Sequence, residues 1–203
     1  MACQNAEREK AKCWAINCQG TINIAQAVRY CDDIHDLPIP LVYLSTDYIF
    51  NGTKGQYVET DIPDPINFYA LSKLIGEIVV QSTTDHYLII RTSFKPRPWK
   101  HPQACTDMYT SADYVDIIAS EIAQVVEHYP DIKNFSSDCE ILHIGTGRKS
   151  VYDLAVQTKP DVGKTTRVEI EEATGLKLPE DTSLDSTTWK IIKHNLLDSR
   201  RMP

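Results

Sequence analysis

The sequence predicts an α/β fold in which parallel β-strands alternate with helices. Three short apolar runs are typical of strands buried in a parallel sheet: residues 41–44, 87–90 and 141–144. The segments between them carry apolar residues at helical spacing. The order helix–strand–helix–strand–helix–strand–helix is that of an α/β domain with about three parallel strands.

The first half of the chain divides at its prolines and glycines. Residues 4–30 are predicted to be a helix, and Pro38 and Pro40 end it before the strand at 41–44. Residues 51–67 are predicted to be a loop, because they hold glycines, prolines and acids without an apolar period. The next helix covers residues 69–82. Its apolar face comprises Leu71, Leu74, Ile75, Ile78 and Val79.

The second half is less regular. Residues 93–114 are predicted to be a long irregular loop, and loops of that length are often functional. A helix over 114–128 precedes the strand at 141–144, and Ser150 with Asp153 forms a predicted capping box that opens the next helix. Beyond Gln157 the chain is polar, apart from a predicted helix at 186–194.

Composition excludes several classes of function. The net charge of −7, with no basic stripe, argues against a nucleic-acid partner. No stretch approaches the roughly 20 apolar residues of a membrane helix, and the N-terminus lacks a signal-peptide pattern. The six cysteines are scattered, which predicts reduced thiols in a cytoplasmic protein and no metal site. The one basic run, residues 91–101, is open to two interpretations: a solvated loop or a phosphate-contacting loop.

A tyrosine–lysine pair carries the predicted chemistry. Tyr69 and Lys73 lie four residues apart in a predicted helix, so both project from one face. A lysine ammonium near a phenol favours the phenolate and lowers the pKa of the phenol. A hydroxyl from Ser45 or Thr46, at the end of a strand, could hold a carbonyl oxygen beside that phenol. Together these groups meet the needs of ketone reduction.

The motifs resemble those of the extended short-chain dehydrogenases/reductases, and within them the dTDP-4-dehydrorhamnose reductase-like family that acts on nucleotide sugars. The similarity is strongest in four segments, residues 42–52, 59–63, 67–77 and 91–93, and weaker elsewhere. The resemblance implies the C-terminal part of a Rossmann-like doubly wound parallel sheet plus a small substrate-binding lobe. It places an incomplete NAD(P)-binding core at residues 1–93, and the substrate loop, the remaining core and the lobe at 94–203.

The resemblance also implies roles for individual residues. Thr46, Tyr69 and Lys73 take the catalytic positions, and Thr46 is placed there by the residues 47–50 that follow it. Adjacent strand residues point to opposite faces, so only one of Ser45 and Thr46 can serve. The implied cofactor is NADP or NAD, bound by Tyr69, Lys73, Ser45 and Asn17. The implied substrate is a nucleotide-activated 4-keto-6-deoxy sugar. Its contacts would be Asp47, Tyr48, Arg91, Lys95, Trp99 and Tyr109.

Several of these assignments have open alternatives. Tyr48 could equally be a core residue, and Arg91 could pair with a carboxylate such as Asp61. Trp99 could anchor its loop instead of stacking on the substrate. Asn17 could be a polar residue in a packed helix, and His143 is interpreted as a packed histidine.

One feature of the family is missing from this sequence. No strand, glycine-rich turn and helix precede the tyrosine–lysine pair, so a chain that starts after the first half of the nucleotide-binding domain is expected. The sheet would then have an exposed edge and an uncovered face. A non-catalytic sugar-nucleotide-binding or regulatory subunit, an epimerase fragment and a non-functional fragment remain alternatives to a reductase. The choice between NAD and NADP is open, and a homo-oligomer is compatible with the sequence.

Overall fold

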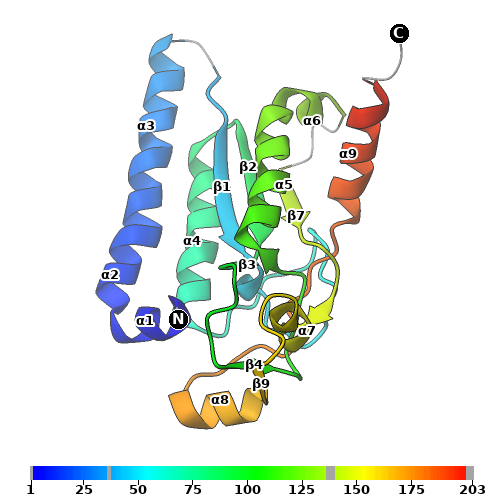
Figure 1. Cartoon of the computed structure of the whole chain (residues 1–203). Helices are drawn as coiled ribbons and strands as arrows, with labels where there is room; N and C mark the ends of the chain where they lie inside the picture. The colour runs from blue at the N-terminus through cyan, green and yellow to red at the C-terminus, as the bar shows by residue number, and fades with distance from the viewer. Residues whose placement is uncertain (1, 36–37, 136–139, 200–203) are drawn as a thin grey trace.

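The core of the protein is a three-stranded parallel sheet, as the sequence predicts (Figure 1). The computed structural model describes residues 2–35, 38–135 and 140–199. The strands are β1 (Leu41–Thr46), β2 (Tyr87–Thr92) and β7 (Ile141–Ile144), in the order β1-β2-β7. Every residue of the central strand β2 is buried. A strand buried on both faces is a continuous apolar run, which explains why these segments were recognisable in the sequence.

One face of the sheet is covered by α4 (Phe68–Thr83), with α3 (Gly20–His35) beside it (Figure 1). Alternate strand residues supply this side of the core, packed against Val80 of α4. They are Leu41, Tyr43, Tyr87, Ile89 and Ile141. The helix begins where Asn67 caps it, because the Asn67 side chain accepts a hydrogen bond from the backbone N–H of Ala70.

The opposite face is covered by α5 (Val115–Glu127), α6 (Tyr129–Phe135) and α9 (Thr187–Ser199) (Figure 1). The larger hydrophobic cluster lies here and includes Leu88, Ile90, Leu142, Ile118 and Trp189. The Glu121 carboxylate accepts hydrogen bonds from the Trp189 indole and the Lys193 ammonium, which ties α9 to α5. The helix predicted at 186–194 is present as α9, which begins at Thr187 and extends to Ser199.

The N-terminal segment is helical but not one continuous helix. It consists of α1 (Ala2–Arg8), α2 (Lys10–Trp14), the π-helix η1 (Ala15–Gln19) and then α3. The Glu7 carboxylate accepts a hydrogen bond from the Phe68 N–H (2.7 Å), so α1 docks on the first turn of α4. Single-turn π-helices often occur at functional sites.

A lobe of short strand pairs lies below the carboxyl ends of the sheet strands (Figure 1). It contains β3 (Phe94–Lys95), β4 (Gln103–Cys105), β5 (Tyr109–Thr110), β6 (Asp113–Tyr114), β8 (Lys149–Ser150) and β9 (Gly163–Thr165), with α7 (Val151–Val156) and α8 (Arg167–Thr174). The prediction of an irregular loop over 93–114 was therefore wrong in part. Its two- and three-residue strands pair with segments distant in sequence, such as β4 with β9, and such short pairings leave no periodic signal.

Two helices in the lobe begin at capping boxes, of which the sequence analysis predicted one. The predicted capping box at Ser150 and Asp153 is present and opens α7. A second capping box, formed by Thr166 and Glu169, opens α8, a helix that the sequence analysis did not predict.

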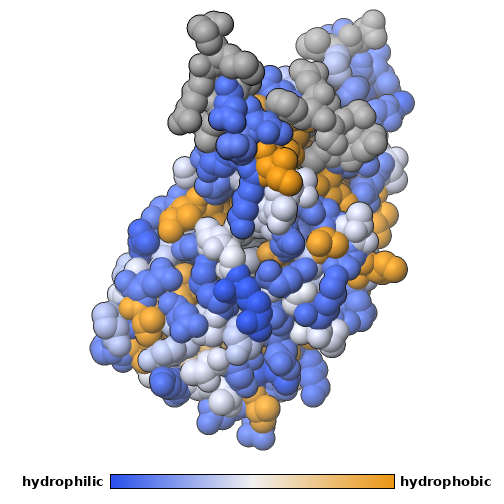
Figure 2. Space-filling view, turned by 90° about the vertical axis from the view of Figure 1, so that its right-hand side faces the viewer, coloured by the Kyte–Doolittle hydropathy of each residue, from blue (hydrophilic) through white to orange (hydrophobic). Residues whose placement is uncertain are grey.

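Strand β1 lies at the edge of the sheet, in agreement with the expected exposed edge. Leu44 is 43% exposed although it belongs to a sheet strand. On the side of the molecule that carries α9, apolar patches are small and separated by hydrophilic surface (Figure 2). Within the described residues, no helix combines the length and apolarity needed to cross a membrane.

Candidate active site

The predicted catalytic groups gather at one end of the sheet. Thr46 is the last residue of β1, and Tyr69 and Lys73 lie in the first two turns of α4. The carboxyl end of β1 and the N-terminal end of α4 point to the same end of the molecule (Figure 1). In open α/β sheets, ligands bind outside the carboxyl ends of the strands. The fold therefore brings the hydroxyl pair and the tyrosine–lysine pair to the edge where such sites form.

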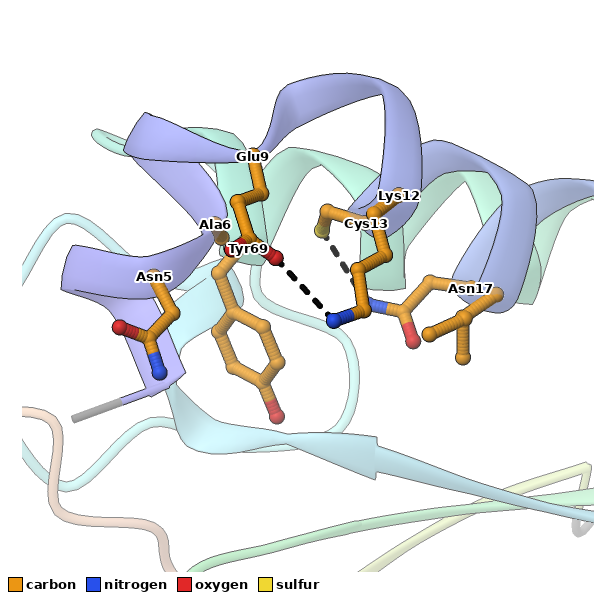
Figure 3. A pocket seen from close by; sticks show the side chains of 8 residues that line it. Asn5, Ala6, Glu9, Lys12, Cys13, Asn17 and Tyr69 are labelled. Atoms are coloured by element: carbon orange, nitrogen blue, oxygen red, sulfur yellow. Dashed lines mark hydrogen bonds and ion pairs between the residues drawn. The ribbon is translucent and has the colours of Figure 1, made fainter.

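Tyr69 lines a pocket beneath the N-terminal helices (Figure 3). The other lining residues come from the N-terminal helical segment, and two of them, Glu9 and Lys12, form an ion pair (3.2 Å). These other lining residues are Asn5, Ala6, Glu9, Lys12, Cys13, Ile16 and Asn17. The phenol thus faces a cavity instead of packing into the apolar core.

Asn17 reaches this pocket from the π-helical turn. Its side-chain amide donates a hydrogen bond to the Ser72 hydroxyl (2.9 Å), and the Cys13 sulfur lies 3.3 Å from the same hydroxyl. Ser72 stands between Tyr69 and Lys73 on α4. Asn17 therefore braces the helix that carries the pair, and its predicted contact with a cofactor stays a prediction.

Lys73 is half-buried beside β1. Its Nζ lies 4.1 Å from the centre of the Tyr43 ring, which belongs to the middle of β1. Burial lowers the pKa of Lys73 to about 8, against the opposing effect of the nearby Glu77 carboxylate. The ammonium thus lies in poorly hydrated surroundings. Because its pKa is close to neutral pH, a small change in burial or in nearby charge changes its protonation.

The two hydroxyls at the end of β1 differ in their partners. Thr46 Oγ1 donates to the Asp47 carboxylate (3.2 Å) and accepts from the Tyr48 N–H (3.3 Å), so it caps the short 3-10 helix η2 (Asp47–Ile49). Ser45 Oγ is buried and has no hydrogen-bond partner among the described residues. Strand alternation puts Ser45 on the same face as Tyr43, which is the face that α4 covers. Both hydroxyls remain candidates for the carbonyl-binding role.

Asp47 is buried (1% exposed) and hydrogen-bonds to residues of the lobe. Its carboxylate accepts hydrogen bonds from Thr182 (2.8 Å) and Thr110 (3.4 Å), two residues of the lobe. Burial raises the pKa of this carboxyl, and the nearby Lys95 ammonium opposes the rise. Asp47 thus joins the end of β1 to the lobe. The predicted substrate contacts of Asp47 and of the half-buried Tyr48 stay predictions.

The structure gives Arg91 a different role from the predicted substrate contact. Its side chain is 4% exposed and pairs with Glu77 of α4 at 2.8 Å and 3.1 Å, and it also donates to the Glu59 carbonyl oxygen. Arg91 points from β2 toward α4, so its guanidinium lies beneath the helix. The carboxylate partner is Glu77 and not Asp61, which pairs with Lys54.

The three predicted substrate contacts in the lobe differ in how deeply they are buried. Trp99 is 8% exposed and packs with Ala104, Ala155 and Val162, so it anchors its segment as the alternative interpretation had it. Tyr109 is half-buried under the Arg148 guanidinium, 3.7 Å from its ring centre. Lys95 is half-buried in β3. Tyr109 and Lys95 keep their predicted roles as proposals only.

Sequence reasoning missed Tyr43, because an aromatic residue in a buried strand looks like ordinary core. His143 was interpreted correctly: it is fully buried, and its Nδ1 donates to the Tyr57 carbonyl oxygen (3.0 Å). Among the described residues, no cluster of histidine, cysteine, aspartate or glutamate could hold a metal ion.

Comparisons with known proteins agree with this architecture. A family described as the RmlD substrate binding domain matches residues 1–95. A curated dTDP-4-dehydrorhamnose reductase of Sinorhizobium fredii is 38% identical over 94 residues, which is 46% of this chain and 30% of that protein. Methionine adenosyltransferase 2 subunit beta of Rattus norvegicus is 52% identical over 40 residues, 20% of this chain and 12% of that protein.

Two solved structures extend the match over nearly the whole chain. The hypothetical dTDP-4-dehydrorhamnose reductase of Sulfolobus tokodaii is 31% identical, with a TM-score of 0.72 over 94% of this chain and 69% of that one. The Bacillus anthracis dTDP-4-dehydrorhamnose reductase, solved in complex with NADP, shares the fold with a TM-score of 0.74 at 21% identity, over 96% of this chain and 76% of that one. The chain belongs to the dTDP-4-dehydrorhamnose reductase-like family of extended short-chain dehydrogenases/reductases. The matched part spans less than a third of each of the first curated relatives.

Proposed function

We propose that this chain carries the carbonyl-reducing residues of an NAD(P)H-dependent reductase of a nucleotide-activated 4-keto-6-deoxy sugar. The observation that carries the proposal is Tyr69 and Lys73 one turn apart on α4, beside the carboxyl end of β1, with Tyr69 lining a pocket. The name of the Sinorhizobium fredii relative, dTDP-4-dehydrorhamnose reductase, supports the substrate class.

Each residue has a defined task in this proposal. Tyr69 donates the proton from its phenol oxygen to the ketone oxygen, which becomes the alcohol. The Lys73 ammonium favours the phenolate that remains and hydrogen-bonds the ribose of the cofactor. The hydroxyl of Thr46 or Ser45 donates a hydrogen bond to the ketone oxygen as negative charge develops there. NAD(P)H, when bound, supplies the hydride.

The fit to the cofactor is limited to its nicotinamide end. The buried Ser45 hydroxyl without a described partner and the Lys73 ammonium are suitable donors for ribose or carboxamide oxygens. The 203 residues contain no Gly-x-x-Gly-x-x-Gly turn, so no residue of this chain is assigned to the pyrophosphate. Residues 1–93 would contribute to the cofactor side. In the segment 94–203, Lys95 and Tyr109 would contribute to the sugar-nucleotide side.

A second candidate function is a non-catalytic subunit that binds a sugar nucleotide or a partner protein. The observation that favours it is the 52% identity over 40 residues to a protein named as a subunit, methionine adenosyltransferase 2 subunit beta. This candidate predicts ligand or partner binding without turnover.

The test is a titration of the purified chain with NADH and NADPH by fluorescence, with circular dichroism on the same sample. It is followed by an assay of dTDP-4-dehydrorhamnose reduction. If the chain is a reductase, Tyr69→Phe should lower turnover by about 10²-fold or more, because it removes the proton donor, and should leave dinucleotide binding intact. Tyr30→Phe, at an exposed tyrosine of α3, is the matched control.

The other outcomes are equally informative. A folded chain that binds a dinucleotide or dTDP-sugar without turnover supports the subunit. A folded chain that binds neither ligand contradicts a reductase and a sugar-nucleotide-binding subunit for these 203 residues, and leaves a subunit that binds a partner protein.

A further inference from the structure

We propose that Tyr43 is a positioning residue for Lys73: its ring face holds the lysine ammonium in place, and Gly76 provides the space that the ring needs. The inference rests on the proposed function for the role of Lys73. Tyr43 lies three residues before Thr46 on β1.

The first observation is the double contact between the two residues. The Lys73 Nζ lies 4.1 Å from the centre of the Tyr43 ring, close enough for a cation–π interaction. The Tyr43 hydroxyl donates a hydrogen bond to the backbone carbonyl oxygen of Lys73 (3.2 Å). Tyr43 is therefore attached to both the backbone and the side chain of the same residue.

The second observation is the glycine opposite the ring. Gly76 lies one turn after Lys73 on α4, and a Cβ at this position would overlap the Tyr43 phenol oxygen and lie 2.6 Å from Cζ. The absence of a side chain at residue 76 therefore lets the ring pass under α4. A glycine inside a helix destabilises that helix, so Gly76 needs a packing reason. The space that the Tyr43 ring occupies is that reason.

The third observation is the surroundings of the ammonium. Besides Tyr43, and Tyr69 one turn earlier on α4, the titratable groups that act on Lys73 are Glu77 on α4 and Cys18 on η1. The Glu77 carboxylate is already paired with Arg91 in the core. The Tyr43 ring face, 4.1 Å from the ammonium, therefore supports it, and unlike a carboxylate it leaves the Lys73 N–H groups available to a ligand.

The experiment measures the titration of Lys73 in the full chain without any ligand. The rate of acylation by acetic anhydride, followed across pH by mass spectrometry of the Lys73 peptide, reports the pKa of that amine. The expected midpoint is about 8 in the unaltered chain. It should be unchanged in Tyr43→Phe, which keeps the ring and removes only the hydroxyl.

Removal or displacement of the ring takes away the cation–π attraction, a loss that by itself lowers the Lys73 pKa, and it admits water to the ammonium, which raises that pKa. Burial is the largest cause of the lowered Lys73 pKa, so the gain of water should outweigh the lost attraction. Tyr43→Leu and Gly76→Ala should therefore both move the midpoint up toward about 10.4, the ordinary pKa of lysine. Tyr152→Leu removes the ring that lies 5.1 Å from the Lys164 ammonium, and this control should leave Lys73 unaffected.

The proposal is overturned if folded Tyr43→Leu keeps the Lys73 midpoint at about 8, or if Tyr43→Phe moves it. Gly76→Ala decides the question if Tyr43→Leu does not fold, because it leaves the tyrosine in the chain. Since the titration uses no dinucleotide and no sugar, it succeeds or fails independently of the proposed reductase activity.

Discussion

The paired charges beneath α4 show how single residues shape this site. Arg91 and Glu77 form a buried ion pair at the carboxyl end of β2, next to the fully buried His143. Removal of one partner from a buried pair leaves an uncompensated charge, so neither residue is free to serve a ligand. His143 must accordingly stay neutral beside the Arg91 guanidinium. Burial, and then this positive charge, lower the pKa of His143 to about 4.

His143 should therefore make stability depend on pH. The unfolded chain takes up a proton on this histidine near pH 6.5, whereas the folded chain does so only near pH 4. The stability contributed by the neutral side chain is complete above about pH 6.5 and is lost as pH falls toward 4. The loss amounts to about 3 kcal/mol. His143→Asn, whose amide can replace the Nδ1–H donor, should flatten this part of the curve.

Urea unfolding at a series of pH values checks the prediction. His86→Asn, at an exposed histidine, is the control and should follow the unaltered chain. A His143→Asn curve with the original slope between pH 6.5 and 4 would show that other groups cause the dependence.

At the scale of elements, α4 is the part that the site depends on most. Its first turn carries Tyr69, and two neighbours satisfy N–H groups there: Asn67 accepts from Ala70, and Glu7 of α1 accepts from Phe68. Helix starts leave four N–H groups without intrahelical partners, so such contacts determine where the helix begins. The register of Tyr69 and Lys73 relative to β1 follows from that start.

Asn67→Ala should thus lower the free energy of unfolding by about 1 kcal/mol, the usual effect of losing an N-cap. It should also fray the turn that holds Tyr69. Chemical denaturation measures the first effect, and amide hydrogen exchange of residues 68–71 measures the second. Asn195→Ala, at an exposed asparagine within α9, is the control. Equal loss of stability in both variants would remove the capping explanation.

At the scale of the whole molecule, the side of β1 away from β2 exposes apolar residues next to an edge strand. Leu44 is exposed on one face of the edge strand, and an apolar row on α3 is exposed as well, including Ile24 (58% exposed), Ala27 and Ile34. These three residues of α3 project from one side of the helix. Together with an unpaired strand edge, such surfaces promote self-association.

We expect the isolated chain to self-associate as its concentration rises, and Ile24→Glu to weaken this association. Size-exclusion chromatography with light scattering, over a series of concentrations, measures the effect. Ile62→Glu adds the same charge at a loop isoleucine that is 88% exposed, and it should change little. If both variants lowered association equally, net charge and not the α3 surface would be the cause.

The sequence by itself determined the order of strands and helices in the core, the start of α7 at its capping box, and the pairing of Tyr69 with Lys73 on one helix face. These features depend on local periodicity, capping and spacing, which residues close in sequence set among themselves. Only the tertiary structure decided that Arg91 pairs with Glu77, that Trp99 is an anchor, that the 93–114 segment forms short strands, and that Tyr43 supports Lys73. Each of these joins residues distant in sequence or on different elements, and such contacts leave no local pattern.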